Sequence, residues 1–310
     1  MVRYAIATLL VPVLIGAAPP VERVVDGDHI VSLRINGVAM RLRVDPAAPS
    51  IALVTPEAAE RAHLRIGRRL GIGFGYGVGP VTVISSTAVA RADFGQGEVK
   101  TRVAWASRPF SAVADGTIGP AALPDTVVTV ALRAPNANDR TVTLRYDQPG
   151  FPMTIFGIGW SYATGEIDLD GQPLNIRFAP NAPRTLATAG AAARLAKAYD
   201  GILSGDPAST DIAFGVARPV RTLTLARPLM LGSLAIGTLG ARVSDDGNGM
   251  TIREAGAPPS RVDPDEVVVT AKGKKRDVRR DTLSIGADLL GRCSSIVFDK
   301  PAHQIRLRCA

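Results

Sequence analysis

The candidate acid–base residues of this chain lie in a seven-residue segment that occurs twice. The first copy, Arg43–Pro49, contains Asp45 within the sequence Asp-Pro-Ala. The second copy, Arg177–Pro183, shares four of the seven residues (Arg, Pro, Ala and Pro) and has Ala179 at the position of Asp45. A carboxylate takes up and releases a proton, whereas a methyl group does neither. The repeat therefore supplies at most one half of a paired-carboxylate catalytic site.

The other reactive side chains form no recognisable catalytic or metal-binding pattern. His29, His63 and His303 stand apart in the sequence and have no ligand spacing, so we predict surface or capping roles for them. The segment Gly159–Ala163 is one residue short of a serine nucleophile elbow and lacks the strand-then-helix context. Glycines alternate through Gly71–Gly79, but their spacing differs from that of a phosphate-binding loop. The sequence predicts no metal and no cofactor.

The two cysteines of the chain, Cys293 and Cys309, are predicted to form a disulfide. In an oxidising compartment, two cysteines near one end of a chain indicate a bridge. Zinc is a poor alternative, because a structural zinc site needs further thiol or imidazole ligands. Strand-like segments flank a turn near Pro301, so a hairpin would set the two cysteines opposite one another.

The repeated segments are expected to lie between a hairpin and a helix in each half of the chain. Alternating apolar residues at His29–Ile35 and Val38–Val44 flank an Asn-Gly turn, and a capped helix follows over Thr55–Leu64. The second half repeats this order, with strand, turn and strand over Ile167–Phe178 and a helix over Thr188–Tyr199. We therefore predict an internal duplication. Two further strands are expected between the halves, at 141–146 and 153–158.

Composition and charge narrow the class of protein. The hydrophobic content of 46% suffices for large cores, and the abundance of Val, Ile, Leu, Gly and Pro favours β structure. The net charge of +8 comes mainly from arginines scattered singly along strands, a pattern typical of a solvated face. No basic stripe is interleaved with aromatic residues, so nucleic-acid binding is not predicted.

The first 18 residues predict export. A basic start is followed by the apolar stretch Tyr4–Ile15 and then by the small residues Gly16–Ala18, which is the order of a secretory signal peptide. The apolar stretch is too short for a membrane anchor, and no later segment reaches the length of a membrane span. We predict a periplasmic or secreted protein.

Taken in order, these segments resemble the aspartic proteases in their two-lobed pepsin-like and single-lobed retropepsin-like forms. Asp45-Pro46-Ala47 lies where that family has Asp-Thr-Gly. Tyr76, Gly77 and Gly79 lie in a glycine-rich hairpin similar to the substrate-binding flap. The segments that resemble the closing strands of the two lobes are Asp115–Gly119, Leu283–Gly286 and Ile296–Asp299. The resemblance covers nearly the whole chain after the signal peptide.

This resemblance implies a mainly β fold of two pepsin/retropepsin-like β-barrel lobes with short helices, related by internal duplication. The implied division is a signal peptide at 1–18, a first lobe at 19–133, a connection at 134–165 and a second lobe at 166–310. The second lobe would carry a flexible surface insertion at 244–280. Within it, Glu266–Ala271 resembles the box by which outer-membrane receptors contact an energy-transducing partner; a lone edge strand is the favoured alternative.

The departures from the family motif bear directly on catalysis. The second lobe has Ala179-Pro180-Asn181 in place of its Asp-Thr-Gly, so the second carboxylate is missing. In the family, the threonine hydroxyls brace the two catalytic loops against each other. Pro46 and Pro180 have neither a hydroxyl nor an N–H group, so that bracing is lost on both sides. The motif glycine is Ala47 in the first lobe and Asn181 in the second.

Two functions remain open at this point. The first is a catalytically impaired protein that binds an extended peptide or protein ligand in the cleft between the lobes. The second is an active aspartic-type endopeptidase in which Asp45 works with a carboxylate from elsewhere in the chain or from another chain. A structural role for Asp45, as a turn residue hydrogen-bonded to nearby backbone, is at least as well supported by the sequence as a catalytic one.

Overall fold

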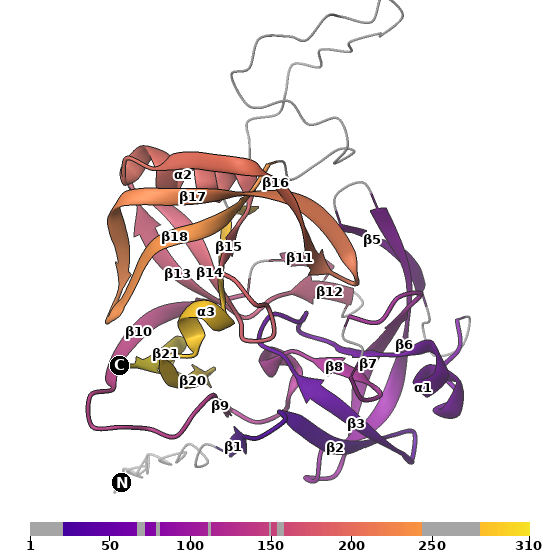
Figure 1. Ribbon diagram of the computed structural model, residues 1–310. Helices are drawn as coiled ribbons and strands as arrows, with labels where there is room; N and C mark the ends of the chain where they lie inside the picture. The colour runs from indigo at the N-terminus through magenta and orange to yellow at the C-terminus, as the bar shows by residue number, and fades with distance from the viewer. Residues whose placement is uncertain are drawn as a thin grey trace, which may run out of the picture.

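The computed structural model describes residues 21–66, 72–78, 81–110, 113–148, 150–153, 158–243 and 280–310. In these residues β-strands predominate and the helices are short (Figure 1). The mainly β class expected from the sequence is therefore confirmed. The predicted signal peptide, and all of the predicted insertion except Arg280, lie outside the described residues.

The first lobe is built on a seven-stranded sheet, counted over the described residues. Its elements are β2 (Ile30–Ile35), β3 (Val38–Val44), β4 (Ala52–Val54), α1 (Pro56–Arg61), β5 (Ile72–Val78), β6 (Val81–Asp93), β7 (Glu98–Ala106), β8 (Gly116–Ile118) and the 3₁₀ turn η1 (Pro120–Ala122). The strand order is β2-β3-β8-β4-β7-β6-β5, and an extra pairing of β2 with β6 closes the sheet on itself. The pairs β3–β8 and β4–β7 are parallel and the others are antiparallel.

The second lobe repeats this order strand for strand. Its elements are β13 (Thr164–Leu169), β14 (Gln172–Ala179), β15 (Leu186–Ala187), α2 (Ala189–Ala198), β16 (Ile202–Ala213), β17 (Val216–Leu231), β18 (Leu234–Arg242), β19 (Thr282–Gly286) and α3 (Ala287–Leu290). The order is β13-β14-β19-β15-β18-β17-β16, with β14–β19 and β15–β18 parallel and the other pairs antiparallel. Every strand of the first lobe thus has a counterpart, which confirms the predicted internal duplication.

The turns of the leading hairpins match as well. Asn36 and Gly37, between β2 and β3, have φ values of 49° and 83°. Asp170 and Gly171, between β13 and β14, have φ values of 56° and 73°. Positive φ at both central residues matches the right-handed twist of a two-residue hairpin, and Asn, Asp and Gly adopt it at low cost. The Asn-Gly turn predicted from the sequence is confirmed, and each hairpin delivers its second strand to the repeated segment.

A layer of further strands joins the lobes. These strands are β1 (Glu22–Val25), β9 (Val127–Ala131), β10 (Arg140–Asp147), β20 (Cys293–Asp299) and β21 (Gln304–Cys309). They continue the sheet of the second lobe in the order β1-β9-β20-β21-β10-β13, so that the first and the last described strands contribute to one sheet. Figure 1 shows the first lobe in indigo to purple at the right and the second in pink to orange at the upper left.

The cores follow from the pattern of apolar residues. In β2 every second side chain, Val31, Leu33 and Ile35, is buried, as expected for a strand with one face on the core. β14 is more continuously buried, which is typical of a central strand that is covered on both faces. Phe178 in β14 meets Phe298 in β20 edge to face, with ring centroids 6.5 Å apart, and so links the second lobe to the joining sheet.

Two predicted elements differ from the observed ones. The strand expected at 153–158 is instead the end of β11 (Gly150–Met153) and the start of β12 (Ile158–Ser161), which pair antiparallel. A run of mostly apolar residues does not fix the ends of a strand, because it has no polar–apolar alternation. The first helix ends at Arg61, three residues before the predicted end at Leu64.

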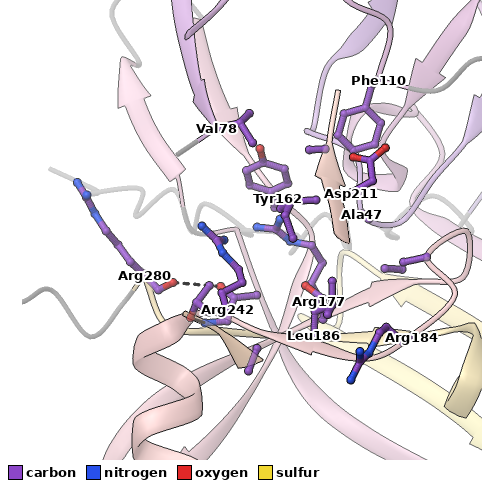
Figure 2. A pocket seen from close by; sticks show the side chains of 18 residues that line it. Ala47, Val78, Phe110, Tyr162, Arg177, Arg184, Leu186, Asp211, Arg242 and Arg280 are labelled. Carbon is purple, nitrogen blue, oxygen red and sulfur yellow. Dashed lines mark hydrogen bonds between the residues drawn. The ribbon is translucent and has the colours of Figure 1, made fainter. Parts of the chain in front are cut away.

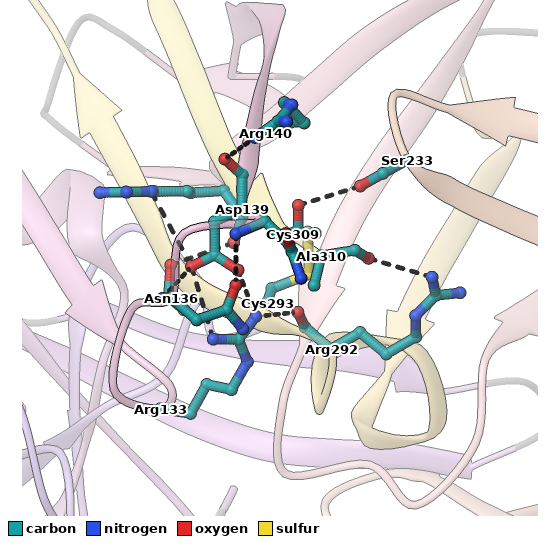
Figure 3. A network of polar contacts seen from close by, with 12 residues as sticks. Arg133, Asn136, Asp139, Arg140, Ser233, Arg292, Cys293, Cys309 and Ala310 are labelled. Carbon is teal, nitrogen blue, oxygen red and sulfur yellow. Dashed lines mark hydrogen bonds and ion pairs between the residues drawn. A yellow bond between two sulfur atoms is a disulfide. The ribbon is translucent and has the colours of Figure 1, made fainter.

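The predicted disulfide is present and closes the C-terminal hairpin. Cys293 and Cys309 are directly opposite in the register of β20 and β21, and both are buried. A network of polar contacts surrounds the bridge (Figure 3). Arg133 donates hydrogen bonds to Asp139, at 2.5 Å, and to the carbonyl oxygen of Arg292, at 2.6 Å. The segment between the lobes is thereby attached to the bridged hairpin.

We expect loss of the disulfide to destabilise the fold without changing it. The two cysteines are 16 positions apart, and closing a loop of this length contributes about 3 kcal/mol to stability on the chain-entropy account. Cys293→Ala/Cys309→Ala should lower the free energy of unfolding in urea by about that amount. Dithiothreitol should destabilise the wild type and leave the double variant unchanged. Equal stability of oxidised and reduced wild type would contradict the prediction.

Candidate functional site

The two copies of the repeated segment form the same turn at corresponding strand ends. In the first lobe, the N–H of Ala48 donates to the carbonyl oxygen of Asp45 at 2.9 Å. In the second lobe, the N–H of Ala182 donates to the carbonyl oxygen of Ala179, also at 2.9 Å. Each turn follows the second strand of a hairpin, β3 or β14, so the duplicated topology places both turns in equivalent positions of their lobes. The proline in each copy is accommodated, because neither turn needs its missing N–H.

The carboxylate of Asp45 is hydrogen-bonded at both of its oxygens. Oδ1 accepts the backbone N–H of Ala47 at 2.8 Å, and Oδ2 accepts the side-chain amide of Asn181 at 3.0 Å. The first bond is a local turn contact, whereas the second crosses from one lobe to the other. Only 4% of Asp45 is exposed. The carboxylate therefore connects the two repeated turns from a buried position.

The environment of Asp45 shifts its acidity. Burial raises the pKa of this carboxyl above its ordinary value, because the charged form loses its hydration. The hydrogen bonds from Ala47 and Asn181 and the charges of Arg43 and His29 act in the opposite direction but do not outweigh burial. A second carboxylate is not the cause of the shift, as it would be in a proton-sharing pair.

The sequence alignment of the repeat set Ala179 opposite Asp45, but the side chain that contacts Asp45 is that of Asn181. Ala179 is buried and has no polar group to offer. Among the described residues, no carboxylate is hydrogen-bonded to Asp45. Asn181 was visible in the sequence as the fifth residue of the second copy. Its role was not, because the contact depends on how the two lobes face each other.

A glycine lies directly behind each turn and permits close packing there. A Cβ atom at Gly119 would approach the carbonyl oxygen of Pro49 to 2.5 Å, and one at Gly286 would approach the carbonyl carbon of Arg184 to 2.3 Å. Both contacts are with backbone atoms, which cannot rotate away. In both lobes, therefore, a glycine at or next to the end of a strand, β8 or β19, lets the segment at the repeated turn pack closely against it.

A pocket of about 480 Å³ lies beside the two repeated turns, since Ala47, Ala179 and Ala182 line it; Figure 2 shows its lining side chains. Its lining residues from the first lobe are Ala47, Val78 and Phe110. Those from the second half of the chain are Tyr162, Arg177, Ala179, Ala182, Arg184, Leu186, Ala187, Thr188, Asp211, Ile212, Ala213, Arg242, Arg280, Thr282 and Ser284. This volume lies within the range of about 300–1,000 Å³ that is typical of ligand pockets. Asp45 is absent from the lining, so the carboxylate lies behind the pocket wall rather than in it.

The predicted flap residues lie at the end of the first-lobe sheet. Tyr76 and Gly77 are in β5, where they pair with Val83 and Thr82 of β6. Gly79 lies outside the described residues. Val78, the last residue of β5, is buried and lines the pocket. The hairpin that resembled a flap is thus positioned at the pocket.

The corresponding hairpin of the second lobe, β16–β17, reaches the first lobe. Its tip residue Phe214 is only 2% exposed and meets Phe110 edge to face, with ring centroids 5.2 Å apart. Phe214 and Val216 belong to an apolar cluster whose other buried members are Ile51, Leu53, Val78, Val83, Ala104 and Ala106. The sequence analysis missed this contact, although an apolar residue beside a turn glycine was a visible signal. The hairpin tip fixes one side of the pocket.

The aspartic proteinase from Irpex lacteus has a similar structure, with a TM-score of 0.41 and 11% sequence identity. The match covers 91% of this chain and 94% of that one. No protein-family model and no curated protein matches the sequence. The two-lobed architecture is therefore established by the repeated strand order rather than by relatives.

No group of three or more His, Cys, Asp or Glu side chains among the described residues is arranged to hold a metal ion. Within the same part of the chain, no helix is both long and apolar enough to cross a bilayer.

We predict that ionisation of Asp45 opposes folding. Because burial raises its pKa in the folded state, the unfolded chain releases the proton first as the pH rises above about 3.9. The folded state then holds more protons, so the contribution of Asp45 to the free energy of unfolding falls until the folded pKa is passed. Asp45→Asn lacks this dependence. The free energy of unfolding in urea would be measured for both proteins between pH 3 and 7. The wild-type value minus the value of Asp45→Asn should decrease as the pH rises. An increase or a constant difference would contradict the prediction.

We also predict that the glycine behind the second turn tolerates no side chain. Gly286→Ala would force the backbone at Arg184 to move, and overpacking of this kind typically costs about 1–3 kcal/mol. Gly237→Ala is the matched control, because a Cβ atom there would meet nothing within 4 Å. Thermal and urea unfolding of both variants provide the measurement. Equal stability of the two variants would show that the turn is not held as described.

Proposed function

We propose that this chain is an exported, two-lobed aspartic-protease-like protein that binds an extended peptide between its lobes and does not cleave it. The observation that carries the proposal is the Asp45–Asn181 hydrogen bond. Aspartic proteolysis needs two carboxylates that share a proton, one to activate water and one to protonate the carbonyl oxygen. Here the partner of Asp45 is the side-chain amide of Asn181, and an amide neither holds nor releases the proton.

The position of Asp45 also argues against catalysis by this residue alone. Both oxygens are engaged, and the side chain is buried behind the pocket wall. A general base must reach the proton that it removes, either directly or through one water. The same contacts suit a structural role, because a carboxylate between an amide and a backbone N–H fixes the two turns relative to each other.

Peptide binding is supported by the strand edges at the pocket. β5 ends the order of the first-lobe sheet and β16 ends that of the second, and each contributes lining residues, Val78 from β5 and 211–213 from β16. An extended peptide adds to such an edge through its backbone, while side-chain pockets select its sequence. The volume beside these edges suits a short segment of chain.

Export and the division into lobes belong to the same proposal. The disulfide between Cys293 and Cys309 supports an oxidising compartment, as a periplasmic or secreted protein would meet. We assign residues 1–18 to the signal peptide, 19–133 to the first lobe, 134–165 to the connection and 166–310 to the second lobe. Contact of residues 266–280 with a partner protein remains a separate hypothesis.

We predict that the purified protein cleaves no peptide by the aspartic mechanism. Wild type and Asp45→Asn should give the same cleavage background on a mixed peptide library between pH 3 and 7, analysed by mass spectrometry. Asp211 is the carboxylate among the described pocket residues, so Asp211→Asn should be assayed beside them. Cleavage by the wild type that is lost in Asp45→Asn would establish the alternative function, an aspartyl peptidase with a second carboxylate.

Binding is tested on the same library by affinity selection. Ala182 lines the pocket, and Ala182→Trp should fill it and abolish retention of peptides. Ala137→Trp, on an exposed loop of the connection, is the control and should retain them. If neither the wild type nor the control retains any peptide, the proposed function is wrong.

A further inference from the structure

A tyrosine hydroxyl at the pocket between the lobes is buried without a hydrogen bond. Tyr162 lines the pocket and is partly exposed as a residue. Its hydroxyl oxygen is buried, and no group among the described residues forms a hydrogen bond with it. The large majority of buried polar side-chain atoms in folded proteins have a partner. An exception at the wall of a ligand pocket therefore calls for an explanation.

The ring that carries this hydroxyl is held by both lobes. The guanidinium carbon of Arg177, in β14, lies 3.8 Å from the centroid of the Tyr162 ring. On the side of the first lobe, the backbone of Tyr162 forms an antiparallel bridge with Pro49. The N–H of Ser50 donates to the carbonyl oxygen of Ser161 at 2.7 Å. The hydroxyl therefore has a defined position beside the first repeated turn.

Two other tyrosines of the chain offer a comparison. Tyr146, in β10, is also buried, but its hydroxyl accepts the side-chain amide of Gln148. Tyr199, at the end of α2, faces a guanidinium as Tyr162 does, with 5.9 Å between its ring centroid and the guanidinium carbon of Arg227. Neither Tyr146 nor Tyr199 is among the described lining residues of the pocket. Tyr162 thus differs from both, because its unpartnered hydroxyl lies beside the pocket.

The surroundings of the hydroxyl indicate which group of a ligand would bind it. In Figure 2 the hydroxyl of Tyr162 points toward Val78, the last residue of β5. β5 ends the strand order of its sheet, so a peptide can add to its edge. A strand paired on one side only has N–H and C=O groups turned to the other side. Such groups need a partner in a buried place, and a hydroxyl can supply one.

We infer that the hydroxyl of Tyr162 donates a hydrogen bond to a backbone carbonyl oxygen of the bound peptide. This inference rests on the proposed function, peptide binding between the lobes, and names a residue that holds the main chain of the ligand. Main-chain hydrogen bonds contribute affinity, whereas side-chain pockets contribute selectivity. Tyr162 therefore strengthens the binding of many peptides alike. The bond also removes the cost of an unpartnered hydroxyl, which the free protein bears.

The first test removes the hydroxyl and keeps the ring. Immobilised wild type and Tyr162→Phe are incubated with the same mixed peptide library, and dissociation constants are measured for the peptides that the wild type retains. We expect binding to Tyr162→Phe to be roughly 10-fold weaker for most of these peptides, because a hydrogen bond is lost. Tyr199→Phe is the matched control and should bind them as the wild type does.

Urea unfolding without peptide distinguishes a ligand-binding hydroxyl from a structural one. Removal of a partnered buried hydroxyl destabilises a fold, whereas removal of an unpartnered one does not. Tyr162→Phe should therefore unfold at the same urea concentration as the wild type or at a higher one. Tyr146→Phe, which deprives Gln148 of its acceptor, should unfold at a lower one. A lower midpoint for Tyr162→Phe together with unchanged peptide affinity would assign a structural role to the hydroxyl and overturn the inference.

Ester analogues of a retained peptide test whether a backbone carbonyl is the acceptor. Each amide of the peptide that the wild type binds most tightly is replaced in turn by an ester, whose carbonyl oxygen is a weaker acceptor. At one position the replacement should weaken binding to the wild type several-fold more than binding to Tyr162→Phe, because the two groups are coupled. Equal losses in both proteins at every position would contradict the inference.

The outcomes separate the inference from the proposed function. If the wild type retains peptides and Tyr162→Phe binds them equally well, the role of Tyr162 is wrong and peptide binding stands. If the wild type retains no peptide, the proposed function is wrong, and the inference fails with it.

Discussion

A part-buried hydrogen bond between the buried Asp45 and the exposed Asn181 joins the two copies of one turn, and the rest of the site is arranged around it. The duplicated topology brings the turns to equivalent strand ends, and Gly119 and Gly286 hold each turn against the strand behind it. A buried carboxylate is costly unless its oxygens are satisfied, and here Ala47 and Asn181 satisfy both. Among the described residues, no second carboxylate is hydrogen-bonded to Asp45.

Duplication followed by divergence accounts for the shape and charge of the pocket. The two lobes share strand order, hairpin turns and helix caps, yet their equivalent hairpins differ. β5–β6 lies at the end of its own sheet, whereas the tip of β16–β17 packs on the other lobe through Phe214 and Phe110. Among the described lining residues of the pocket, the basic ones all come from the second half of the chain. The pocket is therefore asymmetric, although the two lobes around it share one strand order.

The sequence predicted much of the fold and only part of the site. The repeat, the hairpin turns and the disulfide were predictable, because each depends on residues close in sequence or on a fixed strand register. The partner of Asp45 could not be predicted, because the alignment of the repeat pointed to Ala179. Asn181 contacts Asp45 only because of the way the two lobes face each other. The scattered arginines were interpreted as a solvated face. Three-dimensional folding gathers Arg177, Arg242 and two others at one pocket, which no periodicity indicates.

A double-mutant cycle tests most directly whether Asp45 and Asn181 form a structural link between the lobes. The free energy of unfolding would be measured for the wild type, Asp45→Ala, Asn181→Ala and the double variant. A direct bond to a buried charged group predicts a coupling energy of about 1–3 kcal/mol, so the double variant should be less destabilised than the sum of the single ones. A coupling energy near zero would contradict the link and reopen a catalytic role for Asp45.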